Sequence, residues 1–189
     1  MLSAYEVCIL HDKAFFEAKH AIMQKWERFL SHTADEIYPF LSRSTCILPD
    51  EVKMSTPKIS KGENYQGMPY MVLDYPRYFG KEDICVFRNI LLWNRGLYST
   101  WVFQGKYLPL AVQSFSLPSE VEIYLHQNTD KWVHEISPGD ILLEPSTYSN
   151  FILETLNKLD YLKFSAFLSF EQWNVGLSDR VYKVFSCLG

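Results

Sequence analysis

Two apolar runs separated by a short turn constrain the fold of this 189-residue chain more than any other feature. Residues 82–105, EDICVFRNILLWNRGLYSTWVFQG, carry β-branched and aromatic side chains on both sides of a break at Asn94, Arg95 and Gly96, which predicts a β-hairpin. Both faces of its strands are largely apolar, so we expect cover on both sides of the sheet. The register stays open, because a two-residue turn at Arg95 and Gly96 and a three-residue turn from Asn94 to Gly96 pair different residues.

Helical patterns precede this hairpin. From residue 12 to residue 31 apolar side chains recur on one face, which predicts an amphipathic helix with Asp12 as its N-cap. A second helix start is predicted at Thr33, because Glu36 stands three residues later and completes a capping box. Pro39 then keeps this second helix short. Between residues 42 and 61 the chain is polar and lacks periodicity, which indicates a loop or short extended pieces.

The second half of the chain mixes strands and helices. Residues 121–127 and 132–136 alternate around a polar break, which predicts another hairpin. Residues 150–159 have helical spacing, residues 161–170 resemble a strand, and Ser178 is the predicted start of a C-terminal helix. Helices at the two ends with strands between them favour an α+β fold, with a mainly antiparallel sheet flanked by N-terminal and C-terminal helices.

Length and composition predict one globular domain over residues 1–189, because about 100 to 200 residues is the usual size of a domain. Hydrophobic residues make up 48% and charged residues 21% of the chain, which is close to the average for globular proteins. The aromatic share of 16% predicts a core built from large rings.

Net charge, apolar segments and cysteine usage limit the partners and the cellular location expected for this chain. The net charge of −4 offers no cation excess to neutralise a phosphate backbone, so we expect no nucleic acid and no anionic membrane as partner. No segment approaches the roughly 18 apolar residues of a membrane span, and the N-terminus lacks the pattern of a signal peptide. The four cysteines form no CxxC pair, which predicts buried thiols in a cytoplasmic protein.

Familiar catalytic and cofactor motifs are absent from the sequence. The five histidines form neither HxH nor HExxH, so no metal site is predicted, and we expect His126 and His134 to be partly exposed on a sheet. No GxSxG, GxGxxG or Walker A sequence occurs, so no cofactor is predicted. The letters from Ser55 to Lys58 match SxxK, but Pro57 disfavours the helix on which that motif depends.

The residues from 58 to 79, KISKGENYQGMPYMVLDYPRYF, have the composition most suggestive of a site. Gly62 and Gly67 bracket a predicted tight loop, and a strand is expected to follow from Met68 to Leu73 and to end in the residues 74–77. Farther along the chain, Arg88 interrupts an apolar strand. We expect it to pair with Asp74 or to stack on Trp101 or Phe103.

Three interpretations of this stretch follow. In the first, a non-enzymatic domain binds a protein partner or a small ligand through residues 61–77. In the second, an enzyme acts on a small anionic substrate, with Arg77 binding the anion and Asp74 or Glu63 as general base. In the third, the stretch only closes the sheet. The candidate ligand-binding residues are Lys61, Glu63, Asn64, Tyr65, Asp74, Tyr75 and Arg77.

The run GENYQGMPYMVLDYPRYFGKEDI, with the later pieces WVHEI and YLKFSAFLSFEQW, resembles a family of small proteins from the Bacteroidetes group of bacteria. The shared core of that family reads GENYxGxPYxxLDYPR, and with the weaker matches the resemblance extends over about two thirds of the chain. It implies no activity. It adds that the stretch belongs to the family pattern, which fits both a site and a folding element.

Overall fold

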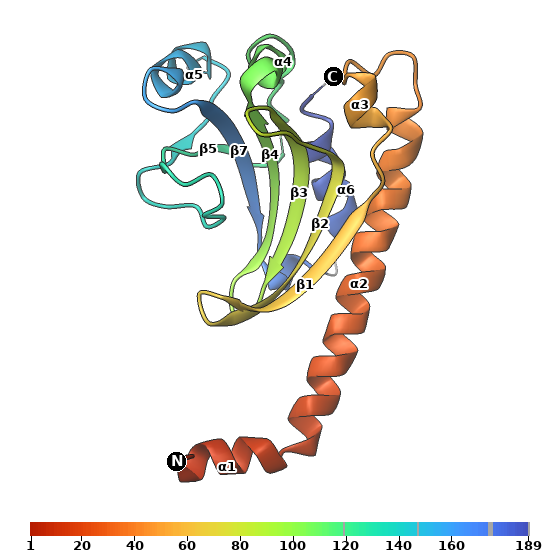
Figure 1. The fold of residues 1–189 in the computed structure, drawn as a ribbon, viewed down its shortest axis with the longest axis vertical. Coiled ribbons are helices and arrows are strands. Elements are labelled where there is room, and N and C mark those ends of the chain that lie inside the picture. Colours follow the sequence, from red (N-terminus) through yellow and green to blue (C-terminus); the bar gives the residue numbers. More distant parts are fainter. Residues whose placement is uncertain (119, 147, 174–175, 189) are drawn as a thin grey trace.

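Seven strands form one sheet, in the order β1-β2-β3-β4-β7-β5-β6, and every neighbouring pair is antiparallel (Figure 1). The structure is a computed structural model that describes residues 1–118, 120–146, 148–173 and 176–188. Helices from both ends of the chain pack on the sheet, so the predicted α+β fold is confirmed. The strands are β1 Lys58–Tyr65, β2 Met68–Phe79, β3 Ile84–Leu92, β4 Gly96–Gln104, β5 Tyr124–Leu125, β6 Ile141–Leu142 and β7 Tyr161–Leu168.

The helices lie mainly on one face and at one end of this sheet (Figure 1). Within the described ranges, no helix is both long and apolar enough to cross a membrane. The α-helices are α1 Ala4–His11, α2 Lys13–Leu41, α3 Asp50–Lys53, α4 Leu108–Ser114, α5 Tyr148–Leu156 and α6 Leu177–Phe185, and the 3-10 helices are η1 Gly105–Tyr107 and η2 Phe170–Gln172.

The predicted central hairpin is confirmed as β3 and β4, and every residue of β4 is buried. Leu92 pairs with Gly96, so the turn consists of residues 93–95 and differs from both predicted turns. Gly96 already belongs to β4, where a Cβ atom would lie 2.6 Å from the carbonyl oxygen of Leu168. The glycine therefore serves the close approach of β7 and not the turn itself.

Large aromatic side chains fill the core between the sheet and the C-terminal helix. The indole of Trp101 donates hydrogen bonds to the carbonyl oxygens of Val184 and Phe185 on α6, each at 3.2 Å. Phe87 and Phe103 pack beside it, with ring centroids 5.1 and 5.4 Å away. These contacts orient α6 across β3 and β4 and bear out the aromatic-rich core expected from composition.

The N-terminal helix is longer than predicted. Asp12 caps α2 as expected, accepting a hydrogen bond from the Phe15 backbone at 2.9 Å, but the helix continues to Leu41 without a new start at Thr33. The Thr33 hydroxyl bonds the Phe29 carbonyl at 3.0 Å, one turn back, so it does not cap a helix. Pro39 lies two residues before the helix end, as its stop signal predicts.

The stretch from residue 58 to 79 forms two strands and not a loop with one strand. β1 and β2 are joined at Gln66 and Gly67, whose φ angles of 51° and 81° suit a two-residue hairpin turn. β2 also continues past Asp74 to Phe79, because one extra residue bulges between Asp74 and Arg77. The bulge takes in Pro76, which has no N–H for the ladder.

The hairpin predicted from residues 121 to 136 is wrong. Only Tyr124–Leu125 is a strand there, and it pairs with β6 and β7. Residues 132–136 lie instead in an irregular segment over the sheet. The predicted helix and strand at 150–159 and 161–170 are confirmed as α5 and β7 with shifted ends, and α6 is preceded by Gly176 as N-cap in place of Ser178.

Candidate functional site

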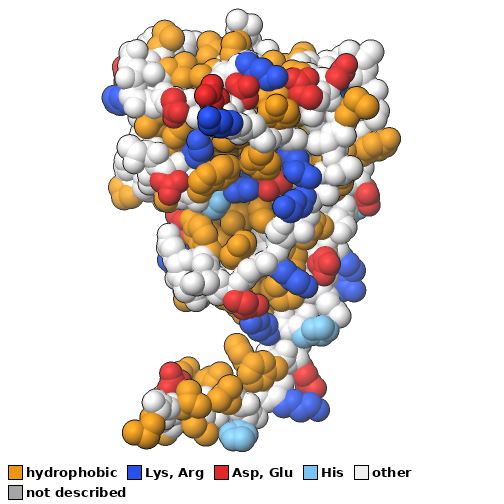
Figure 2. All heavy atoms as spheres, in the orientation of Figure 1, with side chains coloured by type: hydrophobic (Ala, Val, Ile, Leu, Met, Phe, Trp, Pro, Cys, Tyr) orange, Lys and Arg blue, Asp and Glu red, His pale blue; other side chains and the backbone are white. Residues whose placement is uncertain are grey.

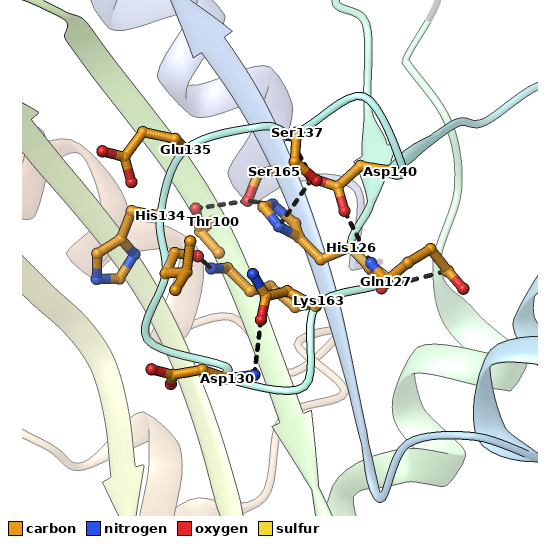
Figure 3. Close-up of polar contacts among 12 residues, drawn as sticks. Thr100, His126, Gln127, Asp130, His134, Glu135, Ser137, Asp140, Lys163 and Ser165 are labelled. Atoms are coloured by element: carbon orange, nitrogen blue, oxygen red, sulfur yellow. Dashed lines mark hydrogen bonds and ion pairs between the residues drawn. The ribbon is translucent and has the colours of Figure 1, made fainter.

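A buried polar cluster lies between the sheet and the irregular segment of residues 126–140, which we name the covering segment (Figure 3). β-strand alternation supplies the sheet side, because every second residue of a strand points to this face. Thr100 and Ser165 sit directly opposite each other on β4 and β7, and Lys163 lies two residues before Ser165. The covering segment brings the other members, His126, Asp130, His134, Glu135 and Asp140.

A chain of polar contacts joins the covering segment to the two strands. His126 Nε2 lies 2.8 Å from the hydroxyl oxygen of Ser165, which is 2.8 Å from that of Thr100. On its other side, His126 Nδ1 lies 3.3 Å from a carboxylate oxygen of Asp140, without the alignment of a hydrogen bond. Asp140 also accepts hydrogen bonds from the backbone of Gln127 and Ser137.

Asp140, His126 and Ser165 are spaced like the orienting acid, the base and the nucleophile of a catalytic triad. The arrangement nevertheless lacks what such a triad needs. The Ser165 side chain has no exposed surface, and its hydroxyl is already shared with Thr100. The covering segment carries both His126 and Asp140. Opening the segment to admit a substrate would therefore remove the base and the acid from the serine, so the arrangement serves to hold the segment in place.

Lys163 is a cation with no exposed surface in this cluster. Its ammonium donates a hydrogen bond to the carbonyl oxygen of Val133 in the covering segment. Its pKa is lowered to about 7, mainly by burial and also by the nearby Arg88, against the opposing effect of Asp140. Near neutral pH this side chain exchanges a proton while fixed between strand and segment.

The two histidines of the cluster are buried, which corrects the expectation of partly exposed sheet residues: His126 is 1% and His134 3% exposed. Burial is the main reason that the pKa of each imidazole lies below its ordinary range, and the nearby Lys163 adds to the effect. The backbone N–H of His134 donates to the Tyr65 hydroxyl at 2.9 Å, and that hydroxyl donates to Glu135 at 2.6 Å. Tyr65 thus ties the β1–β2 hairpin to the covering segment.

Asp74 and Arg88 form a bidentate ion pair beside this cluster, with nitrogen–oxygen distances of 2.6 and 2.9 Å. This is one of the two arrangements expected for Arg88. The alternative, stacking on Trp101 or Phe103, is wrong, because those side chains point to the opposite face of the sheet. The guanidinium instead lies 4.8 Å from the ring centre of Trp132 on the covering segment.

The structure does not bring the seven predicted ligand-binding residues into one pocket. Asp74 and Tyr65 border the polar cluster, whereas Tyr75 is buried in the core on the other face. Arg77 points away from Asp74 and donates to the Thr56 carbonyl at 3.1 Å. The three others are exposed in the second half of β1: Lys61, Glu63, which binds Lys19 at 2.8 Å, and Asn64, which accepts a hydrogen bond from the Gly67 backbone at 3.2 Å.

A second candidate site is a hollow of about 340 Å³ where α2 meets the β3–β4 turn and η2. We name it the aromatic pocket. Sequence reasoning missed it, because its walls come from three segments more than 60 residues apart and no local pattern joins them. Its lining residues are Ile22, Lys25, Trp26, Trp93, Asn94, Phe170 and Trp173.

The aromatic pocket has walls of rings in contact. The rings of Trp26 and Phe170 stack with centroids 5.8 Å apart, and Trp93 meets Trp26 edge to face at 5.6 Å. The ring of Phe29 packs against the indole of Trp173, with ring centroids 4.9 Å apart. The indole N–H of Trp93 is buried and has no acceptor among the described residues.

Neither site contains a metal-binding constellation: in the parts of the chain that the structure describes, no three His, Cys, Asp or Glu side chains are grouped to hold an ion. The resemblance to the Bacteroidetes family stays a hypothesis after comparison with known proteins. No family model, curated protein or solved structure matches the chain.

Proposed function

We propose that the protein is a non-enzymatic binding domain that holds a small, flat, apolar molecule with an anionic group in the aromatic pocket. The observation that carries this proposal is the convergence of Trp26, Trp93 and Trp173 from three distant segments on one hollow. Its volume of about 340 Å³ falls in the range of small-molecule sites, about 300 to 1,000 Å³. Such sites combine mainly apolar walls with a few polar groups that orient the ligand.

The polar groups at the pocket define the second part of the ligand. Lys25 is exposed at its rim and supplies a positive charge that suits a carboxylate or another anion. The buried N–H of Trp93 has no acceptor in the part of the chain that the structure describes, and burying an unpaired donor costs about 1 to 3 kcal/mol. A ligand oxygen recovers that cost only when the indole of Trp93 moves, because its N–H has no exposed surface in this structure. Flat rings of the ligand then stack on the indoles.

Two observations favour binding over catalysis. Lys25 is the one titratable side chain among the described residues that line the pocket, so an acid–base pair is lacking there. The alternative interpretation, an enzyme that acts on a small anionic substrate, needs Asp74 or Glu63 beside Arg77 as the general base. Both carboxylates have other partners, Arg88 and Lys19.

The experiment is a thermal-shift and tryptophan-fluorescence screen of the purified chain against aromatic carboxylates, such as indole-3-acetate and 2-naphthoate, and their neutral amides. A ligand present at 100 times its Kd stabilises the fold by about 2.7 kcal/mol. We expect carboxylates to bind more tightly than the matched amides. Replacing Lys25 by Met should remove this preference while both ligands still bind.

Two tryptophan variants separate the pocket from the rest of the molecule. Trp173→Ala should abolish binding, whereas Trp132→Phe, on the opposite face of the sheet, should leave it unchanged. Thermal unfolding of each variant without ligand confirms that the fold survives. The proposal is refuted when no aromatic carboxylate stabilises the chain, or when Trp132→Phe reduces binding as much as Trp173→Ala.

A further inference from the structure

The N-terminal residues 2–18 project from the body as an arm built from α1 and the first turns of α2 (Figures 1 and 2). None of the residues of α1 is buried, and the buried residues of α2 begin only at Trp26. Of residues 2–18, all but the half-exposed Ile9 are exposed. The arm is therefore held in place by the continuity of α2 and not by packing.

The surface of this arm is unusually apolar for an exposed element. α1 reads AYEVCILH, and its one acidic residue, Glu6, is used in the capping box with Ser3. Figure 2 shows hydrophobic side chains spread over the arm, which stands apart from the body. Six large apolar side chains are 41 to 74% exposed: Leu2, Tyr5, Val7, Leu10, Phe15 and Phe16.

We infer that the arm is a self-association surface whose partner is a second copy of this chain. An eight-residue helix such as α1 is marginal in water by itself, since isolated helices shorter than about 12 to 15 residues rarely hold. Packing against another protein surface gives it the burial that the body of its own chain does not. Two identical arms that cross about a two-fold axis bury the same apolar side chains on both copies.

The area of the arm fits this partner. A fully buried aromatic side chain removes about 150 to 250 Å² from water, so a half-exposed one offers on the order of 100 Å². Three of the six side chains are aromatic and three aliphatic, so together they offer at most on the order of 600 Å² of the roughly 800 Å² that each partner of a standard interface buries. The apolar side chains of the arm thus account for most of the area of such an interface.

The charges of the arm argue against a lipid surface as partner. Interfacial helices that bind anionic lipid carry a surplus of Lys and Arg on the polar face. Here Lys13 is paired with Glu17 at 3.2 Å, and Glu6 and Asp12 add negative charge. Residues 2–18 contain three acidic side chains against one lysine. The arm thus lacks the surplus of cations that an anionic lipid surface requires.

Sedimentation velocity of the full chain, over a hundredfold range of concentration, tests this inference. We expect a species of twice the 22.2 kDa of one chain, in equilibrium with monomer. Leu10→Glu and Phe16→Glu should each weaken the dimer at least tenfold. Because both side chains are exposed, thermal unfolding of the body should be unchanged.

A matched control is Leu153→Glu on α5, which places the same charge on an equally exposed leucine of the body and should leave the dimer intact. A chain that stays monomeric throughout, or a dimer that Leu153→Glu disrupts as strongly as Leu10→Glu, overturns the inference. So does binding of a monomeric chain to phosphatidylcholine–phosphatidylglycerol vesicles that Leu10→Glu abolishes. The result is independent of whether the aromatic pocket binds a ligand.

Discussion

Arg88 and Asp74 lie directly opposite each other on β3 and β2, and the guanidinium holds both carboxylate oxygens, at 2.6 and 2.9 Å. Their side chains are only 15% and 9% exposed. The pair occupies the junction between the sheet and the covering segment, because Trp132 packs on the guanidinium from above. A pair this well buried and this well aligned is costly to break from one side.

We therefore expect Asp74→Asn to destabilise the fold by about 3 kcal/mol, because Arg88 would remain as a buried cation with a weaker partner. Urea denaturation measures this loss. The double variant Asp74→Leu with Arg88→Met should lose less than the sum of its two single variants, since neither charge is then left unpaired. Additive losses would show that the two side chains act independently.

Because of the buried Lys163, the free energy of unfolding should depend on pH above neutrality. Its pKa of about 7 lies below the ordinary 10.5, so between these values the unfolded chain binds a proton that the folded chain lacks. The free energy of unfolding should rise by up to about 1.4 kcal/mol per pH unit between pH 7.5 and 9.5, and fall again as the pH returns to 7. Denaturation at several pH values should show this slope in the wild type and a reduced slope in Lys163→Met. Lys158→Met, which changes an exposed lysine, is the control.

The buried histidines predict a loss of stability in acid. The pKa of His134 lies well below its ordinary 6.5 in the folded chain, so only the unfolded chain gains this proton just below pH 6.5. The free energy of unfolding should fall by up to about 1.4 kcal/mol per pH unit from pH 6.5 to 5 on this account. His134→Gln should reduce the slope, whereas His20→Gln, on the exposed side of α2, should not. Equal slopes in wild type and His134→Gln would contradict the prediction.

Gly96 should tolerate no side chain. An added Cβ would lie 2.6 Å from the Leu168 carbonyl oxygen and 2.7 Å from the Phe167 ring, so the start of β4 would have to move away from β7. We expect Gly96→Ala to cost about 1 to 3 kcal/mol in urea denaturation. Gly139→Ala, where nothing lies within 4 Å of the added atom, should change the stability little.

Several local patterns in the sequence were informative. Alternating and β-branched residues located β3, β4 and β7, and Asp12 marked the start of α2, because these signals depend on neighbours within a few positions. It misled where tertiary contacts overrode the local signal. Thr33 and Glu36 have the letters of a capping box, yet the apolar stripe of α2 continues through them to pack on the sheet.

The candidate sites were harder to predict for the same reason. Because Arg88 interrupts an apolar strand, it was expected either to pair with Asp74 or to stack on an aromatic ring of the next strand, and it pairs with Asp74. The expected grouping of Asp74 with Arg77 failed, because the bulge between them turns Arg77 toward Thr56. The aromatic pocket depends on how α2 crosses the β3–β4 turn, and only the assembled fold shows that crossing.

α2 is one unbroken helix of 29 residues that is packed on the sheet at one end and free at the other. At a rise of 1.5 Å per residue, the free part before Lys19, which binds Glu63 on β1, extends about 9 Å along the helix axis. The length and direction of α2 thus set how far from the sheet, and on which side of it, any partner of α1 is held. Shortening α2 by two residues ahead of Trp26 would turn α1 by about 200° around that axis as well as drawing it inward.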